Sequence, residues 1–202
     1  MKQTLKKLLP KNRFARSVSV LAGGTTLGQG IVALSSPILT RLYTPEDFGL
    51  LAVYAALLMT IGVIASLRYQ LAIPLPDKEQ EAAHVVILSL IIVSGMCLLS
   101  IIAVFFFRDQ IVNMVNTPRL ANYLWLLPPG IFLLGIYEIF YYWALREKAF
   151  TAISRTKLIQ PVSMVTVQIG GYLLGPLALL LGQISGRAAG TTSLGKLIFQ
   201  KR

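Results

Sequence analysis

Long apolar runs alternate with short charged segments along nearly the whole chain, and this pattern restricts the fold more than any other feature. Most of these runs are long enough to cross the hydrocarbon core of a bilayer as one helix. Apolar residues make up 55% of the sequence and the mean hydropathy is +0.68, values typical of membrane proteins. We therefore predict an all-α integral membrane protein with six transmembrane helices. The predicted spans are residues 17–42, 45–69, 82–107, 121–145, 158–174 and 177–199.

A short polar turn with the sequence RLYTPED separates the first two apolar runs. Pro45 suits the first position of a helix, where its missing N–H group costs nothing. Thr44 can cap that helix, and Glu46 and Asp47 fall in its first turn, where the helix dipole favours negative charge. The sequence thus predicts that one helix ends and another begins within this turn, as a tight hairpin at a membrane surface.

The segment RLYTPEDFGLLAVY is followed about one helix later by SLRYQLAIPLP. Together these segments resemble the first hairpin of bacterial polysaccharide and O-antigen flippases. Those proteins belong to the superfamily of multidrug, oligosaccharidyl-lipid and polysaccharide exporters. The resemblance is clearest over residues 10–82. It implies translocation (flipping) of lipid-linked oligosaccharide across the cytoplasmic membrane during the synthesis of polysaccharide, O-antigen and lipopolysaccharide.

The resemblance also implies an architecture and partners. In that family two lobes, each resembling the six-helix bundle predicted here, face each other across a central cavity and alternate access to it. The sequence has room for one lobe, so we expect a truncated or half transporter with the second lobe absent. The implied partners are a lipid-linked oligosaccharide on a diphosphate lipid carrier, membrane lipids, and a second lobe or a second copy of the chain.

Two other functions fit the same pattern of apolar runs. One is a drug or ion exporter of the same superfamily, and the other is a non-transport membrane subunit of polysaccharide assembly. The sequence has no P-loop, HExxH or GxSxG motif, so we expect no enzymatic activity and no cofactor. Cys97 is the single cysteine and His84 the single histidine, which leaves no metal site to expect.

The positive charges predict how the chain sits in the membrane. The net charge is +11, but the basic residues occur in short segments rather than along one face of a soluble fold, so we expect no nucleic-acid partner. Of the segments between the predicted spans, those on one side of the membrane hold only three basic residues: Arg41, Arg108 and Arg119. By the positive-inside rule, both termini are predicted to be cytoplasmic. The resemblance to bacterial flippases implies that the membrane is a bacterial inner membrane. Most of the 19 Lys and Arg residues fall on the cytoplasmic side, in the basic segment 1–16, in residues 68–81 and 146–157, and at the C-terminal end with the tail 200–202.

Two ionisable residues stand inside predicted spans. Arg187 lies near the middle of the sixth span, where an arginine costs about 2.5–3.5 kcal/mol on insertion scales. It is a candidate cation for the diphosphate of a lipid-linked sugar, because a guanidinium matches phosphate oxygens bidentately. Glu138 in the fourth span is a candidate proton or sodium site for coupling. The alternative for both is a structural ion pair with each other, or, for Glu138, snorkelling to the interface.

Two further residues are candidates for lining a cavity. Arg68 is part of the flippase-like segment at the predicted cytoplasmic mouth, and the resemblance implies a substrate-binding role for it. The alternative is a positive charge that simply ends a helix. Gln29 is polar at mid-depth in a span rich in small residues, including Gly24 and Gly28, which suits either a cavity wall or close helix packing.

Overall fold

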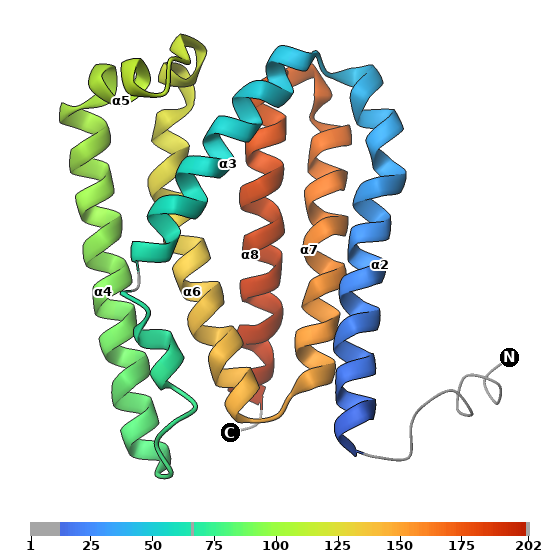
Figure 1. Ribbon diagram of the computed structural model, residues 1–202, viewed down its shortest axis with the longest axis vertical. Coiled ribbons are helices and arrows are strands. Elements are labelled where there is room, and N and C mark those ends of the chain that lie inside the picture. The colour runs from blue at the N-terminus through green and yellow to red at the C-terminus, as the bar shows by residue number, and fades with distance from the viewer. Residues whose placement is uncertain (1–12, 66, 201–202) are drawn as a thin grey trace, which may run out of the picture.

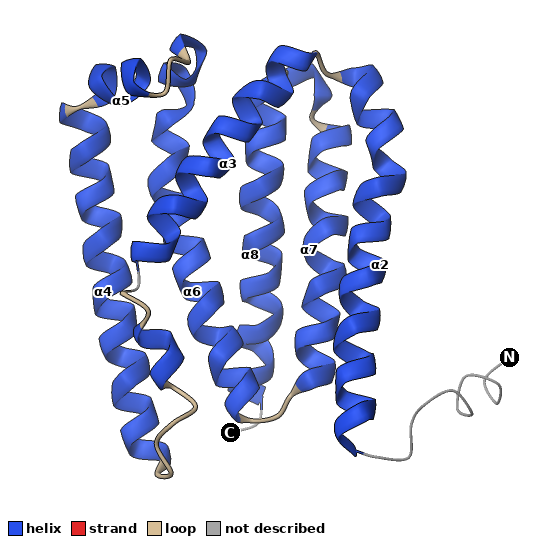
Figure 2. Ribbon diagram, in the orientation of Figure 1, coloured by secondary structure: helices blue, strands red, loops and turns tan. Residues whose placement is uncertain are grey.

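The computed structural model describes residues 13–65 and 67–200, and in these ranges it contains helices and no strand (Figure 1, Figure 2). The predicted all-α fold is therefore confirmed. Residues 1–12 of the predicted basic segment and residues 201–202 of the predicted tail lie outside the described ranges. The long helices are α2 (Arg13–Leu42), α3 (Pro45–Ala65), α4 (Glu79–Phe106), α6 (Leu127–Arg146), α7 (Phe150–Gly170) and α8 (Pro176–Gln200). The shorter elements are α5 (Arg108–Met114) and the 3₁₀ helices η1 (Tyr69–Ala72), η2 (Pro118–Leu126) and η3 (Tyr172–Leu174).

Several of these helices can cross a membrane by their length and composition. Helices α7 and α8, with 21 and 25 residues, are long enough to cross but carry more polar and charged residues. They run alongside the others in the same bundle (Figure 1). The chain thus has the features of a multi-pass membrane protein, while six spans remain a prediction where α7 and α8 are concerned. In the described chain, four segments are both long enough and apolar enough to cross a membrane: Ser17–Leu42, Pro45–Val63, Glu79–Phe106 and Pro118–Arg146.

Most of the long helices form a row, with α3 lying obliquely across it. Helix α2 packs on α7, α7 on α8, α8 on α6 and α6 on α4, while α3 contacts both α6 and α8 (Figure 1). The largest buried cluster lies where α3 crosses the row, and Tyr54, Leu58 and Ile131 are fully enclosed there. The Tyr54 hydroxyl donates to the Leu126 carbonyl at 3.0 Å, which satisfies its only polar atom inside this apolar core.

The predicted hairpin is present. Helix α3 begins at Pro45, the Asp47 N–H donates to Thr44 Oγ1 at 3.3 Å, and the Thr44 N–H donates to Asp47 Oδ2 at 3.1 Å. This reciprocal pair satisfies two backbone donors at the helix start. Tyr43, just before the turn, is buried and donates to the Gln168 carbonyl of α7. Burial, together with the charge of Asp47, raises the pKa of the Tyr43 hydroxyl, so Tyr43 stays a neutral donor.

The second predicted span ends earlier than expected. Helix α3 stops at Ala65, not at residue 69, and Leu67 and Arg68 adopt left-handed conformations with φ of 45° and 58°. The end of α3 lies well inside the bundle, and the segment after it runs along α4 toward the start of that helix (Figure 1). Residues 67–78 are therefore not a simple surface loop at the mouth, as predicted, because they pack against α4 and α6 and bury Ile73 completely.

The fifth helix also differs from the prediction. Helix α7 begins at Phe150 rather than near residue 158. Arg155 and Lys157, which were expected in a basic loop, therefore lie on α7. No glycine or proline separates residue 150 from residue 160, so nothing in the local sequence prevents the helix from starting early. The two charged side chains favoured the prediction of a loop, but they are part of the helix.

Glycines allow α7 to approach the helices on both of its sides. A Cβ on Gly28 of α2 would overlap the Lys157 carbonyl, and a Cβ on Gly186 or Gly190 of α8 would meet Gln160. Backbones that come this close gain van der Waals contact along the whole interface. The packing interpretation of these small residues is thus supported.

Candidate functional site

Arg187 lies on α8 where this helix faces α3 and α6. Its side chain is partly buried, and among the described residues its Nε finds no hydrogen-bond acceptor. Its charge interacts with the hydroxyl of Tyr54 on α3 and with the carboxylate of Glu138 on α6. A direct ion pair between Arg187 and Glu138, the structural alternative, is not formed. The described chain holds two ion pairs, and neither includes these residues: Lys78–Glu81 and Asp47–Arg119.

Glu138 is the negative centre of a group of positive side chains. The cations that act on its carboxylate are, in order of strength, Lys157 of α7, Arg187 of α8 and Arg68 at the start of η1. Glu138 is partly buried, whereas Arg68 is exposed. Three positive charges thus act on one carboxylate, and the four side chains together carry a net positive charge. We call these four residues the Glu138 cluster.

Lys157 was not predicted as a site residue, yet its charge acts on the Glu138 carboxylate. Its Nζ lies 5.9 Å from the ring centroid of Tyr137 and 5.5 Å from that of Tyr141. Such cation–π contacts hold an ammonium group over an apolar wall without neutralising it. The Tyr137 hydroxyl is in turn 3.3 Å from Thr156 Oγ1, which fixes the aromatic wall against α7. The sequence signal that would have found Lys157 is the unbroken helical stretch from residue 150 onward.

Arg68 follows the point at which α3 breaks inside the bundle. Non-helical backbone at membrane depth is tolerated where protein covers it or where it lines a wet cavity. Here the segment after the break is held by Arg146 at the end of α6. The Arg146 guanidinium donates to the carbonyls of Ile73 at 3.4 Å, Asp77 at 3.2 Å, and Pro76. Arg146 is thus a positioning residue for the segment that carries Arg68.

Gln29, the remaining predicted site residue, is not brought to this cluster. It lies on α2, which packs against α7, and its side chain is exposed. The structure therefore brings together Arg187, Arg68 and Glu138, adds Lys157, and leaves Gln29 apart.

Chemically, the Glu138 cluster suits binding of an anion rather than of a metal ion. Guanidinium and ammonium groups donate hydrogen bonds to phosphate oxygens but cannot ligate a cation. Within residues 13–65 and 67–200, no three His, Cys, Asp or Glu side chains converge. His84 is exposed on α4, and the Cys97 thiol contacts the Pro128 carbonyl at 3.6 Å.

Comparison with known protein families gives one match. A family model described as "polysaccharide biosynthesis protein" matches residues 38–194. The matched range begins near the end of α2 and extends through most of α8, so it contains the whole Glu138 cluster. Comparison with curated proteins finds no match, and comparison with solved structures finds none either.

Proposed function

The chain belongs to the family of polysaccharide biosynthesis proteins, and from this we propose that it flips lipid-linked oligosaccharide across a bacterial inner membrane, as one lobe of a transporter. The coarser conclusion, a role in polysaccharide synthesis or export by a multi-pass membrane protein, follows from the family and the apolar helices. Flipping is the more specific proposal, and the positively charged residues of the Glu138 cluster support it.

The observation that carries the proposal is the excess of positive charge around Glu138. A lipid-linked sugar presents a diphosphate between its apolar tail and its polar head, and this charged group is the most expensive part to move through a bilayer. Arg187 has a buried Nε without an acceptor, and a phosphate oxygen is the acceptor that suits it best. Lys157 and Arg68 would add point charges from two other elements.

Glu138 then has a proposed part in coupling. While the site is empty of substrate, its carboxylate offsets part of the positive charge of Lys157 and Arg187. An arriving diphosphate competes with it for the same cations, so uptake of a proton at Glu138 would favour substrate binding. No part of this scheme needs an enzymatic step or a cofactor. A pump for cationic drugs fits less well, because the cluster would repel them.

The experiment that tests this function measures flipping directly. A lipid-linked oligosaccharide with a diphosphate carrier is placed in vesicles that contain the complete transporter, and its appearance in the opposite leaflet is followed. We expect Arg187→Ala to reduce the rate about 10- to 100-fold, the range of one charged hydrogen bond. Arg187→Lys keeps the charge but loses the bidentate fork, so it should retain partial activity.

The matched control is Lys196→Ala, which removes an exposed cation from the same helix. It should flip at the unmodified rate. Equal rates for Arg187→Ala and Lys196→Ala, with both variants inserted in the membrane, would reject the proposed site.

A further inference from the structure

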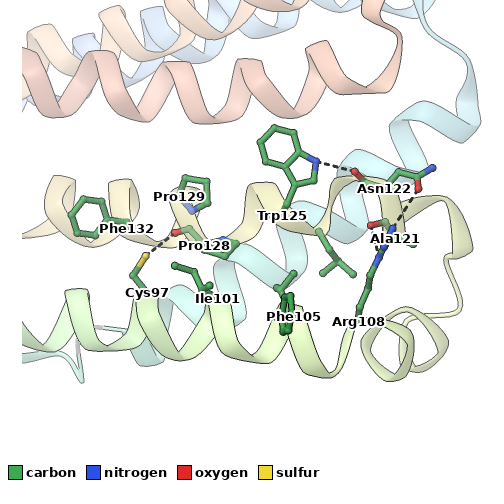
Figure 3. Close-up of a pocket in the computed structure, with 12 residues that line it drawn as sticks. Cys97, Ile101, Phe105, Arg108, Ala121, Asn122, Trp125, Pro128, Pro129 and Phe132 are labelled. Carbon is green, nitrogen blue, oxygen red and sulfur yellow. Dashed lines mark hydrogen bonds between the residues drawn. The ribbon is translucent and has the colours of Figure 1, made fainter.

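A second site lies on the other side of α6, between this helix, η2 and α4. It is a lateral groove with a volume of about 750 Å³, within the size range of ligand-binding pockets. Figure 3 shows Cys97, Ile101 and Phe105 of α4 forming one wall, with Trp125, Pro128 and Phe132 opposite them. Apart from its ends, the groove is lined by apolar side chains, so a polar ligand would lose hydrogen bonds with water and gain few in return.

The length of the groove matches one leaflet of a bilayer. Cys97 and Phe132 lie at one end and Arg108 at the other (Figure 3). At 1.5 Å per residue, the distance along α4 from Cys97 to its last residue, Phe106, is about 14 Å, and Arg108 follows at the start of α5. The hydrocarbon core of a bilayer is about 30 Å thick, so the groove extends from the membrane surface to about its middle.

The surface end of the groove carries a positive charge. Arg108 Nε donates to the Ala121 carbonyl at 3.1 Å, and Nη2 donates to Asn122 Oδ1 at 3.5 Å. These two neutral acceptors orient the guanidinium at the end of the groove (Figure 3). Arg108 is in neither of the two ion pairs of the described chain. Trp125, whose Nε1 donates to the Asn122 carbonyl at 2.9 Å, marks the interfacial level.

We propose that this groove binds one anionic phospholipid, with an acyl chain between α4 and α6 and its phosphate on Arg108. The occupant is a lipid of the leaflet at the α5 end of the bundle. The apolar part of the groove is about as long as one leaflet and suits an acyl chain, and the cation at its end suits the phosphate of an anionic headgroup. A packed protein helix fits less well, because it would bury Arg108, which has no ion-pair partner in the described chain. The much longer isoprenoid chain of a carrier lipid exceeds the groove.

The test uses Trp125 as the reporter of what fills the groove. The chain has two tryptophans, so Trp143→Phe leaves Trp125 as the only one. The full chain is placed in phosphatidylcholine vesicles with increasing fractions of brominated phosphatidylglycerol or of brominated phosphatidylcholine, and quenching of Trp125 fluorescence is measured. We expect phosphatidylglycerol to be preferred about fivefold, the contribution of one basic residue near an anionic lipid.

Two substitutions at the surface end test the role of the charge. Arg108→Gln should abolish the preference for phosphatidylglycerol. Asn122→Asp keeps the hydrogen-bonding shape but places a carboxylate beside Arg108, so it should abolish the preference as well, and it guards against a folding defect in the first variant. Arg41→Gln is the control, because it removes an exposed cation at the end of α2 and should leave the preference unchanged.

Three results would overturn the proposal. Equal quenching by the two brominated lipids would mean that the groove has no affinity for an anionic headgroup. Protection of Trp125 from both lipids would mean that a second copy or a second lobe covers it. Displacement of brominated phosphatidylglycerol by a polyprenyl phosphate at a lower fraction than by unlabelled phosphatidylglycerol would assign the groove to the carrier lipid. None of these readouts depends on transport, so they are independent of the proposed flipping function.

Discussion

Lys157 shows at the scale of one residue how a cation is kept available inside a membrane protein. Two tyrosine rings lie beside its ammonium group, and its charge acts on the carboxylate of Glu138. We expect Lys157→Gln to lower the flipping rate about tenfold by removing one charge from the cluster. Arg155→Gln is the matched control, since Arg155 is exposed on the same helix. Equal flipping rates for the two variants would exclude a role for Lys157 in binding substrate.

A double substitution distinguishes two roles of Arg187: pairing with Glu138 and binding of substrate. If they act mainly as a structural pair, Arg187→Ala leaves the partly buried Glu138 carboxylate without one of its cations, and Glu138→Ala in addition should restore what was lost. If substrate needs the cation, the double variant stays as impaired as Arg187→Ala, and this is the outcome we expect. Surface polysaccharide in cells that depend on the transporter provides the measurement. Recovery in the double variant would contradict the binding role.

The sequence predicted part of this site because intramembrane charge is visible without a structure. Arg187 and Glu138 stand out as ionisable residues in apolar runs. Lys157 did not, because its neighbours in sequence are charged and suggested a loop. Its position depends on where α7 begins: residues 150–160 contain no glycine or proline and can be helical, but the packing of α7 against α2 and α8 is seen only in the structure. The cation–π contacts of Lys157 with the tyrosines of α6 are likewise tertiary contacts, which a local sequence pattern cannot predict.

At the scale of the elements, the contact of α2 with α7 depends on Gly28. A Cβ at Gly28 would overlap the Lys157 carbonyl, whereas Gly30 has open space around it. We expect Gly28→Leu to destabilise the protein by about 1–3 kcal/mol through overpacking. Gly30→Leu, the control on the same helix, should be neutral or slightly stabilising, because leucine favours a helix more than glycine does. Thermal unfolding in detergent compares the two, and equal melting temperatures would contradict the observed packing.

Local rules also explain which element boundaries the sequence could predict. The hairpin at residues 43–47 was correct because Thr44, Pro45 and Asp47 each favour a helix start on their own. The break after Ala65 was missed because Leu67 and Arg68 carry no preference for left-handed backbone. Contacts of the following segment with α4 and α6 impose that conformation, so the sequence near the break gives no warning.

At the scale of the whole molecule, the structure separates two ends of the bundle. The α2–α3 turn and α5 lie at one end, and the α6–α7 connection lies at the other (Figure 1). We predict that the first end faces away from the cytoplasm. In a Cys97→Ser background, cysteines placed at the exposed Glu46 and Asn113 should react with an impermeant thiol reagent added outside. A cysteine at exposed Glu147 should react only after the membrane is opened, and the reverse pattern would invert the topology.

The hydrogen bonds from Arg146 to the carbonyls of Ile73, Pro76 and Asp77 also have a consequence for biosynthesis. The partners are about 70 positions apart in the chain, so these bonds cannot form while the ribosome is still making α4. Until α6 emerges, residues 67–78 have no anchor on that helix and remain open to protease at Lys78. Nascent chains arrested before residue 146 should therefore be cut there by trypsin, whereas chains arrested well beyond α6 should resist. The chain would then insert α3 and α4 first and assemble the segment between them only later.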